Sequence, residues 1–367
     1  MATLKNTIVN DIGFLQLPAG TTAERLNAPI GSIGEMRFNT SLNRVEFYDG
    51  SNWIGSDEYP GYITNATGGS VSWSNVAAGS LQGNYKVHVF NSTENFTINA
   101  FTGCPVIEYL IVAGGGAGGY LYGGGGGAGG MITGKTDVNF ILNNGTGIYT
   151  VTVGGGASAP GSATTQTTVG GDSSVFGVIA HGGGGGAHGE FVDSTTNMGA
   201  KSGGSGGGGG STNSVASLPG GSVGRMPGKG IGREGNPGSN GNMYGGNQFR
   251  PAAGGGGAGF PGDHGYTGNG PVGGGGAGGQ GRYTNITGSD TIFAGGGGGG
   301  SGAWNGAVPG GAGGGGYGGG GGITTPSYQA ANGDAAKGGG GGGGGDTAKP
   351  IPGSGGSGVV ILKYRFS

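Results

Sequence analysis

This chain of 367 residues has few of the residues on which ordinary globular proteins depend. It has one cysteine, Cys104, so no disulfide can form within the chain, and we expect this thiol to pack in a β-sheet. Charged residues make up 9% and the formal net charge is −2, which argues against a nucleic-acid partner. Hydrophobic residues make up 32%, and no apolar run approaches the roughly 18 residues of a membrane span. Any conventional core must therefore be small.

Glycine is the abundant residue, with 108 in total, and only 12 of these lie in the first 110 residues. Nearly pure glycine runs recur from residue 114 to residue 358 with short breaks between them. Such low-complexity sequence often forms flexible linkers. Large apolar residues in the breaks, the low charge and strand-like sequence at both ends of the region all favour an ordered structure here.

The ordered form that we expect is a bundle of parallel and antiparallel polyglycine-II helices over residues 114–358. Such a helix has three residues per turn and no internal hydrogen bonds, so its backbone groups need partners in neighbouring helices. Glycines spaced by three would line the inward edge of a helix. Two sets have this spacing: Gly232, Gly235, Gly238 and Gly241, and Gly259, Gly262, Gly265 and Gly268. A collagen triple helix needs the same spacing, but four triplets with little proline are too short for one.

Strands are expected on both sides of the glycine region. Residues 1–60 should form a small β arm, because Met36–Thr40 and Val45–Tyr48 alternate apolar and polar residues around a turn. Residues 61–113 should form a β-rich collar, closed by a strand at 359–366. We expect collar strands at Lys86–Phe90, Asn95–Ile98, Val106–Ala113, Ile148–Val153 and Val175–Ile179. The predicted fold class is mostly β and irregular, with almost no α-helix.

Motifs for catalysis are weak. Gly114, Gly116 and Gly119 follow a strand-like segment in the spacing of a dinucleotide fingerprint, but more glycines follow where a helix should start. The four histidines are not in a metal-ligand pattern, and His88 is expected to pack in a strand. We therefore predict no enzymatic activity, no cofactor and no bound metal.

Aromatic and arginine residues in the breaks are better candidates for function, because such residues dominate binding hot spots and loops on a rigid scaffold carry function. The other possibility is that they pack along the bundle and shield its backbone. The candidates for receptor binding are Tyr244, Phe249, Arg250, Phe260, His264, Tyr266, Arg282, Tyr283 and Trp304.

The N-terminal segment resembles the N-terminal module of tailed-phage virion proteins, especially fibre proteins of marine phages. The resemblance rests on Ile33–Thr40, Val45–Gly50 and Trp53 and covers about one seventh of the chain. It implies attachment to other virion subunits and assembly as a homo-oligomer, for which a trimer is expected. The candidates for virion attachment are Met36, Phe38, Phe47, Tyr48 and Trp53.

Residues 62–367 resemble glycine-rich phage and bacterial surface domains and the glycine-helix bundle of phage long-tail-fibre tip adhesins. The specific part is the pair of strand-like segments that opens and closes the glycine region. The resemblance implies a protein made in the host cytoplasm and built into a virion, with loops that recognise a host-surface protein or polysaccharide. The chain differs from the tip adhesins because it carries its own N-terminal module. A purely structural capsid, head-fibre or decoration protein, and a depolymerase, are the alternatives.

Overall fold

The structure, a computed structural model, is rich in β-strands, and its described residues contain almost no helix, which confirms the predicted fold class. The chain divides into two compact units, residues 1–61 and 62–367. The described part of the chain contains no helix with the length and apolarity of a membrane span. The structure describes residues 17–24, 33–48, 53–55, 61–75, 84–138, 147–189, 199–211, 234–241, 251–265, 274–301, 315, 329–346 and 350–366.

The first unit contains a four-stranded sheet in the order β1 (Ala19–Gly20), β2 (Met36–Asn39), β3 (Arg44–Tyr48), β4 (Trp53–Gly55). Strand β1 pairs in parallel with β2, and the other neighbours are antiparallel. Asn43 turns the chain between β2 and β3 with a φ of 52°. The two strands predicted in this segment are confirmed.

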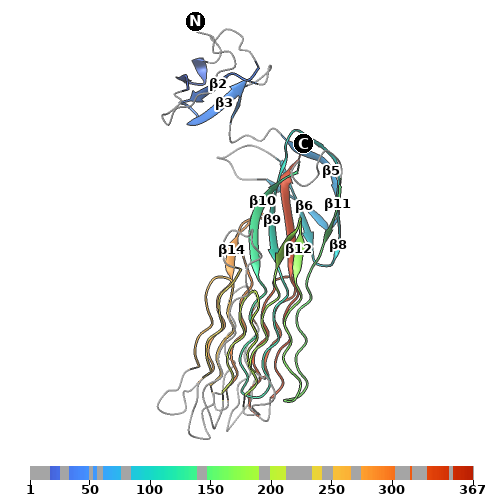
Figure 1. Cartoon of the computed structure of the whole chain (residues 1–367), viewed down its shortest axis with the longest axis vertical. Helices are drawn as coiled ribbons and strands as arrows, with labels where there is room; N and C mark the ends of the chain where they lie inside the picture. Colours follow the sequence, from blue (N-terminus) through green and yellow to red (C-terminus); the bar gives the residue numbers. More distant parts are fainter. Residues whose placement is uncertain are drawn as a thin grey trace, which may run out of the picture. The chain divides into compact units, whose positions relative to one another are not determined.

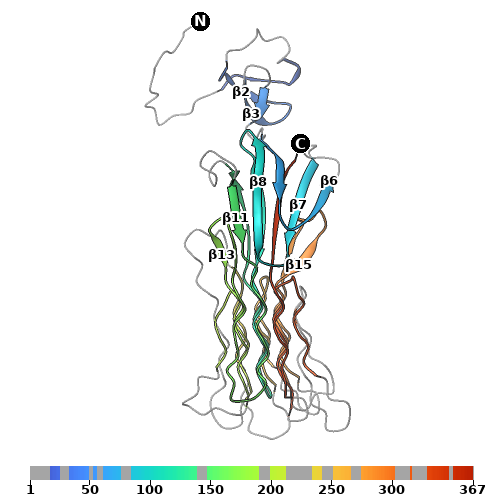
Figure 2. The same cartoon turned by 90° about the vertical axis from the view of Figure 1, so that its right-hand side faces the viewer.

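The collar of the second unit, shown in Figures 1 and 2, is built from two sheets. The larger sheet is antiparallel and has the order β10 (Met131–Asp137), β9 (Val106–Val112), β16 (Val359–Arg365), β7 (Asn84–Phe90), β6 (Ser70–Asn75). The smaller has the order β11 (Gly147–Val151), β8 (Glu94–Thr102), β5 (Tyr62–Thr67). Val359 pairs with Val112, so the strands that open and close the glycine region are neighbours, as predicted.

Both faces of the larger sheet are covered, because β16 sends apolar side chains alternately to each face. Val360 and Leu362 belong to a buried cluster with Phe96 of the smaller sheet. Val359 and Ile361 belong to a second cluster with Phe293. A run of consecutive apolar residues such as Val359–Leu362 is therefore fully buried.

Two short hairpins complete the collar, namely β12 (Ser173–Val175) with β13 (Val178–Ala180) and β14 (Arg282–Thr284) with β15 (Thr291–Phe293). The single strand predicted at Val175–Ile179 is wrong. Phe176 and Gly177 have φ values of 53° and 76° and form a two-residue turn between β12 and β13. The expectation for Cys104 is also wrong, because this residue is exposed in the turn between β8 and β9.

Two histidines of this unit, His88 and His188, are buried. His88 lies in β7, a strand as predicted, where its Nδ1–H donates to the Gly68 carbonyl at 2.6 Å and its Nε2 is hydrogen-bonded with the Tyr364 hydroxyl at 2.8 Å. Nδ1 of His188 accepts from the N–H of Tyr120, in the turn at residues 120–122, at 2.9 Å. Its Nε2–H donates to the Thr165 carbonyl at 3.0 Å. Burial lowers the pKa of both His88 and His188.

The glycine runs extend side by side from the end of the sheets (Figures 1 and 2) and bond to one another through their backbones. Residues 123–130 form a central run whose successive N–H groups donate to three different neighbours in turn. Those neighbours are residues 181–187, 253–256 and 338–344. The carbonyls of the central run accept from residues 113–119, 205–208 and 297–300. One run is thus bonded to six others.

These bonds repeat with a period of three residues. Gly124, Gly127 and Gly130 donate to one neighbouring run, while Gly125 and Ala128 donate to another. A period of three is what polyproline-II-type geometry requires; the helix type itself stays a prediction. In the perimeter run at 259–265, Gly262 and Gly265 are buried, while Phe260, Pro261, Asp263 and His264 are exposed, as the spacing of three predicted.

Candidate functional site

The hairpin β14–β15 borders a hollow of about 430 Å³ at the end of the glycine runs next to the sheets. Figure 1 shows β14 at this junction, and Figure 2 shows β15 there. The lining residues are Gly259, Phe260, Gln280, Gly281, Arg282, Tyr283 and Ile292. We call this hollow the hairpin pocket. Its volume falls in the range of roughly 300–1,000 Å³ that is usual for small-ligand sites.

Phe260 is held at the pocket by a tight reversal of the chain. The Gly257 N–H donates to the Phe260 carbonyl at 2.9 Å. The N–H groups of Gly259 and Phe260 both donate to the Gln280 carbonyl, at 2.9 and 3.0 Å. The backbone is therefore fixed on both sides of the residue, while the side chain of Phe260 is 64% exposed. Fixed backbone with an exposed ring suits a binding contact.

Tyr283 and Arg282 are neighbours on β14, but their side chains have different surroundings. Tyr283 pairs with Ile292 of β15 and is 68% exposed. The Arg282 side chain is half-buried, and its Nη2 lies 3.5 Å from the carbonyls of Met131 and Ala258. Burial lowers the pKa of Arg282. Arg282 therefore ties the hairpin to β10 and the glycine runs, whereas Tyr283 is presented to solvent.

Three of the nine predicted receptor-binding residues, Phe260, Arg282 and Tyr283, come together at this pocket. His264 lies on the same run as Phe260 but does not line the pocket. Its Nδ1–H donates to the Asn240 carbonyl at 3.1 Å. The other five predicted residues lie outside the described part of the chain: Tyr244, Phe249, Arg250, Tyr266 and Trp304.

Sequence reasoning missed two side chains of the pocket. Gln280 is exposed, and Ile292 is half-buried on β15. Neither residue type marks a site in a glycine-rich sequence, and β14 and β15 were not predicted as strands. The β-branched and aromatic residues Thr291, Ile292 and Phe293 were the available signal for a short strand.

A second, more polar hollow of about 230 Å³ lies against the residues that follow in the chain. Thr284, Asn285 and Ile286 line one side of it. The other side includes Glu108 and Lys135, whose Oε1 and Nζ atoms are 2.7 Å apart in an ion pair. We call this hollow the polar pocket. The two pockets thus border consecutive residues of the same hairpin.

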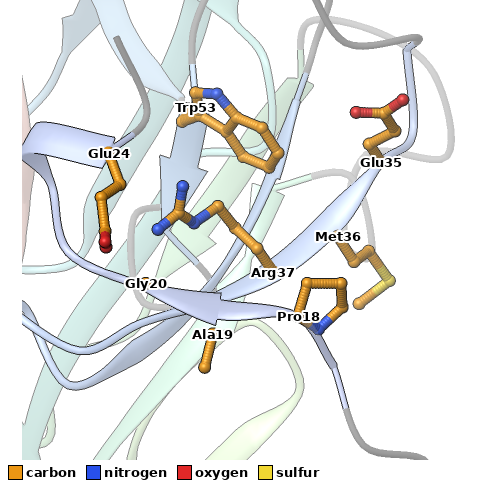
Figure 3. A pocket seen from close by; sticks show the side chains of 8 residues that line it. All are labelled: Pro18, Ala19, Gly20, Glu24, Glu35, Met36, Arg37 and Trp53. Atoms are coloured by element: carbon orange, nitrogen blue, oxygen red, sulfur yellow. The ribbon is translucent and has the colours of Figure 1, made fainter. Parts of the chain in front are cut away.

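The first unit has a pocket of its own, with a volume of about 390 Å³. Figure 3 shows the side chain of Arg37 extending between Trp53 and Glu24. The Arg37 guanidinium lies 5.7 Å from the centre of the Trp53 ring, and its Nη2 donates to the Thr21 carbonyl at 3.0 Å. This distance is within the range of a cation–π contact. The guanidinium therefore fixes the Trp53 ring at the pocket.

The predicted virion-attachment residues are distributed over this unit. Met36 and Trp53 line its pocket, and Met36 is 51% exposed. The Tyr48 and Trp53 rings have centres 5.5 Å apart. Phe38 and Phe47 are half-buried on β2 and β3. An apolar ring and a thioether beside charged groups form a surface on which another subunit could pack.

Nothing among the described residues resembles a metal centre, since no group of three His, Cys, Asp or Glu side chains is placed to hold an ion. The comparison with protein families finds a match to the glycine-rich domain over residues 91–365. This match covers most of the second unit, including the hairpin pocket and the strands β9 and β16, which open and close the glycine region. No curated protein matches the chain.

Proposed function

Since the chain belongs to the glycine-rich domain family, we propose that it is a non-enzymatic phage virion protein whose glycine runs carry a surface for recognition of the host. The observation that carries the proposal is the exposed pair Phe260 and Tyr283, held beside one pocket on a backbone-bonded scaffold. Functional residues gather where a rigid framework fixes them. The resemblance to phage tip adhesins supplies the link to a virion.

The scaffold supports this role because its interior leaves little space for side chains larger than the methyl group of alanine. A Cβ atom added at most buried glycines of the runs would lie within 3.0 Å of a neighbouring backbone atom. Side-chain variety is therefore restricted to the perimeter and the ends of the runs. The side chains at the perimeter can therefore change while the backbone-bonded interior stays the same, which suits a protein whose recognition residues vary.

We propose that residues 1–60 attach the protein to other virion subunits and that the assembly is a homo-oligomer, with a trimer as the working hypothesis. The first unit is compact, and its pocket presents Trp53 and Met36 beside charged side chains. Aromatic residues and methionine are enriched at protein interfaces. In this proposal the first unit serves assembly, and the second unit serves host recognition.

The test is binding of the purified full-length protein to whole cells of the phage host. We expect saturable binding that the double variant Phe260→Ala, Tyr283→Ala weakens at least tenfold, while the melting temperature stays the same. Wild-type protein that remains in virions but binds no host cell would contradict the recognition role and favour a structural component. Loss of surface polysaccharide on incubation with the protein would instead indicate a depolymerase.

A further inference from the structure

We propose that the hairpin β14–β15 binds a neutral oligosaccharide chain, one sugar packing on Phe260 and Tyr283 in the hairpin pocket and a following sugar in the polar pocket. This proposal rests on the recognition function above and names the class of its ligand. The ligand would therefore lie on the side of the glycine bundle, at the end of the runs that adjoins the sheets.

Phe260 and Tyr283 form an exposed aromatic pair at the hairpin pocket. Among the large apolar side chains that the structure describes as exposed, two are aromatic, and both line the hairpin pocket. Phe260 and Tyr283 come from segments that are far apart in the sequence and are joined through the bonds to the Gln280 carbonyl. The face of an aromatic ring carries partial negative charge and attracts the C–H face of a sugar ring.

The polar groups of the hairpin pocket favour an uncharged ligand. None of the described residues that line it carries a carboxylate, so a basic peptide has no counter-charge among them. The cation among these lining residues, Arg282, is half-buried with its Nη2 3.5 Å from the carbonyls of Met131 and Ala258, so the guanidinium is already engaged and is poorly placed to select an anion. Gln280 is exposed at the pocket, and an amide side chain both donates and accepts hydrogen bonds, as sugar hydroxyl groups do.

The polar pocket indicates a chain of sugars. Thr284 and Asn285 directly follow Tyr283, and they line the second hollow together with Thr133. These three residues bring hydroxyl and amide groups to the hollow, and its two charged residues, Glu108 and Lys135, are paired with each other. A ligand that passes from one pocket to the next along β14 meets first an aromatic surface and then a polar one. Repeating sugars, with an apolar face and a hydroxyl edge, fit this order.

A folded protein partner fits less well. A stable protein interface covers about 800 Å² on each partner and surrounds its hot spots with a dry rim. Here the aromatic pair is followed along the hairpin by exposed Asn285, Ser289 and Asp290. A host-surface protein is therefore an outcome that the test must recognise.

The experiment measures binding of the full-length protein to an immobilised panel of defined neutral oligosaccharides of two to six hexose or N-acetylhexosamine units, with heparin as an anionic probe. We expect binding to at least one neutral oligosaccharide. Phe260→Ala and Tyr283→Ala should each weaken that binding at least tenfold. Tyr283→Phe, which keeps the ring, should retain most of it. The matched control is Ile148→Ala, at a residue that is 68% exposed on β11, which belongs to a different sheet from β14.

Three results would overturn the proposal: no binding to any neutral oligosaccharide, binding to heparin alone, or neutral binding that both alanine variants leave unchanged. Thermal melting of each variant checks that the fold is kept. Adsorption of virions that carry the Phe260→Ala, Tyr283→Ala pair separates the two levels of inference. Lost adsorption without oligosaccharide binding would keep the recognition function and identify the ligand as something other than a neutral glycan. Unchanged adsorption together with lost oligosaccharide binding would keep the sugar site and contradict its role in host recognition.

Discussion

A single methyl group in the centre of the glycine bundle should destabilise the protein strongly. Gly125 lies in the central run, where its N–H donates to Ala253 at 3.0 Å and its carbonyl accepts from Gly208 at 2.7 Å. A Cβ atom at Gly125 would meet the backbone of Gly297 at a separation that real Cβ atoms do not show. The atoms that this Cβ would meet are backbone atoms, which cannot rotate away as a side chain can. The neighbouring runs would therefore have to move apart.

The magnitude follows from two effects. Overpacking a tight interior costs about 1–3 kcal/mol. Disturbing the two backbone bonds adds roughly 1 kcal/mol each. We therefore expect Gly125→Ala to lower the free energy of unfolding by about 3–5 kcal/mol. For a unit of this size, roughly 2 °C of melting temperature corresponds to each kcal/mol, which gives a decrease of about 6–10 °C.

Gly155 provides the matched control, because it lies in a bonded run but faces open space. Its carbonyl accepts from the Gly171 N–H at 2.8 Å, and a Cβ atom there would have nothing within 4 Å. Gly155→Ala should stabilise the protein by about 0.4–1 kcal/mol, since alanine restricts the unfolded chain. Calorimetric melting of both variants is the assay. Melting temperatures within about 2 °C of each other would refute the idea that close backbone packing holds this region together.

Further predictions concern the buried histidines, the hairpin and the first unit. Because burial lowers the pKa of His88 and His188, the unfolded chain binds more protons than the folded one as the pH falls below about 6.5. Stability should thus be complete above pH 6.5 and decrease towards pH 5, and His188→Gln, which keeps a donor and an acceptor, should flatten this decrease in melting curves. Arg282→Ala should cost about 1–2 kcal/mol and abolish oligosaccharide binding, because it frees the hairpin from two carbonyls; unchanged melting would contradict the anchoring role. Trp53→Ala should leave melting of the second unit unchanged but reduce incorporation into virions, measured by quantitative immunoblot, and full incorporation would contradict attachment through this pocket.

The sequence was sufficient to predict the strands that frame the glycine region, for a physical reason. Val359–Leu362 and the apolar residues of β9 form continuous apolar runs, and such runs must be buried on both faces. The glycines at 259, 262 and 265 also indicated a perimeter run, because a helix with three residues per turn repeats its inward edge at that interval. The first inference depends on a continuous apolar run and the second on a spacing of three, and a single sequence contains both of these local patterns.

The hairpin pocket could not be predicted as a unit, because it depends on contacts between distant residues. Phe260 approaches Tyr283 only because the Gln280 carbonyl accepts from Gly259 and Phe260. Each strand of the hairpin has three residues, too short for alternation to be distinguished from a glycine-rich break. The Val175–Ile179 error has a related cause. Phe176 adopts a positive φ, which is uncommon for a bulky residue and which its sequence does not announce.

The hairpin pocket lies where the backbone-bonded glycine runs meet the apolar core of the sheets, and this junction explains its position. The glycine runs are bonded through their backbones and bury alanine methyl groups such as those of Ala128 and Ala258, whereas the face of the larger sheet that bears Val359 and Ile361 has a row of larger apolar side chains. The hairpin covers that row, because Ile286 and Phe293 belong to the same buried cluster as Val359 and Ile361. One face of the hairpin is thus committed to the sheet, and the side chain of Tyr283 is left outside. Apolar packing holds one face of the hairpin, and Arg282 holds its side. The outward residues of the hairpin can therefore be exchanged without disturbing the sheets or the glycine runs. A recognition site whose residues vary requires this property.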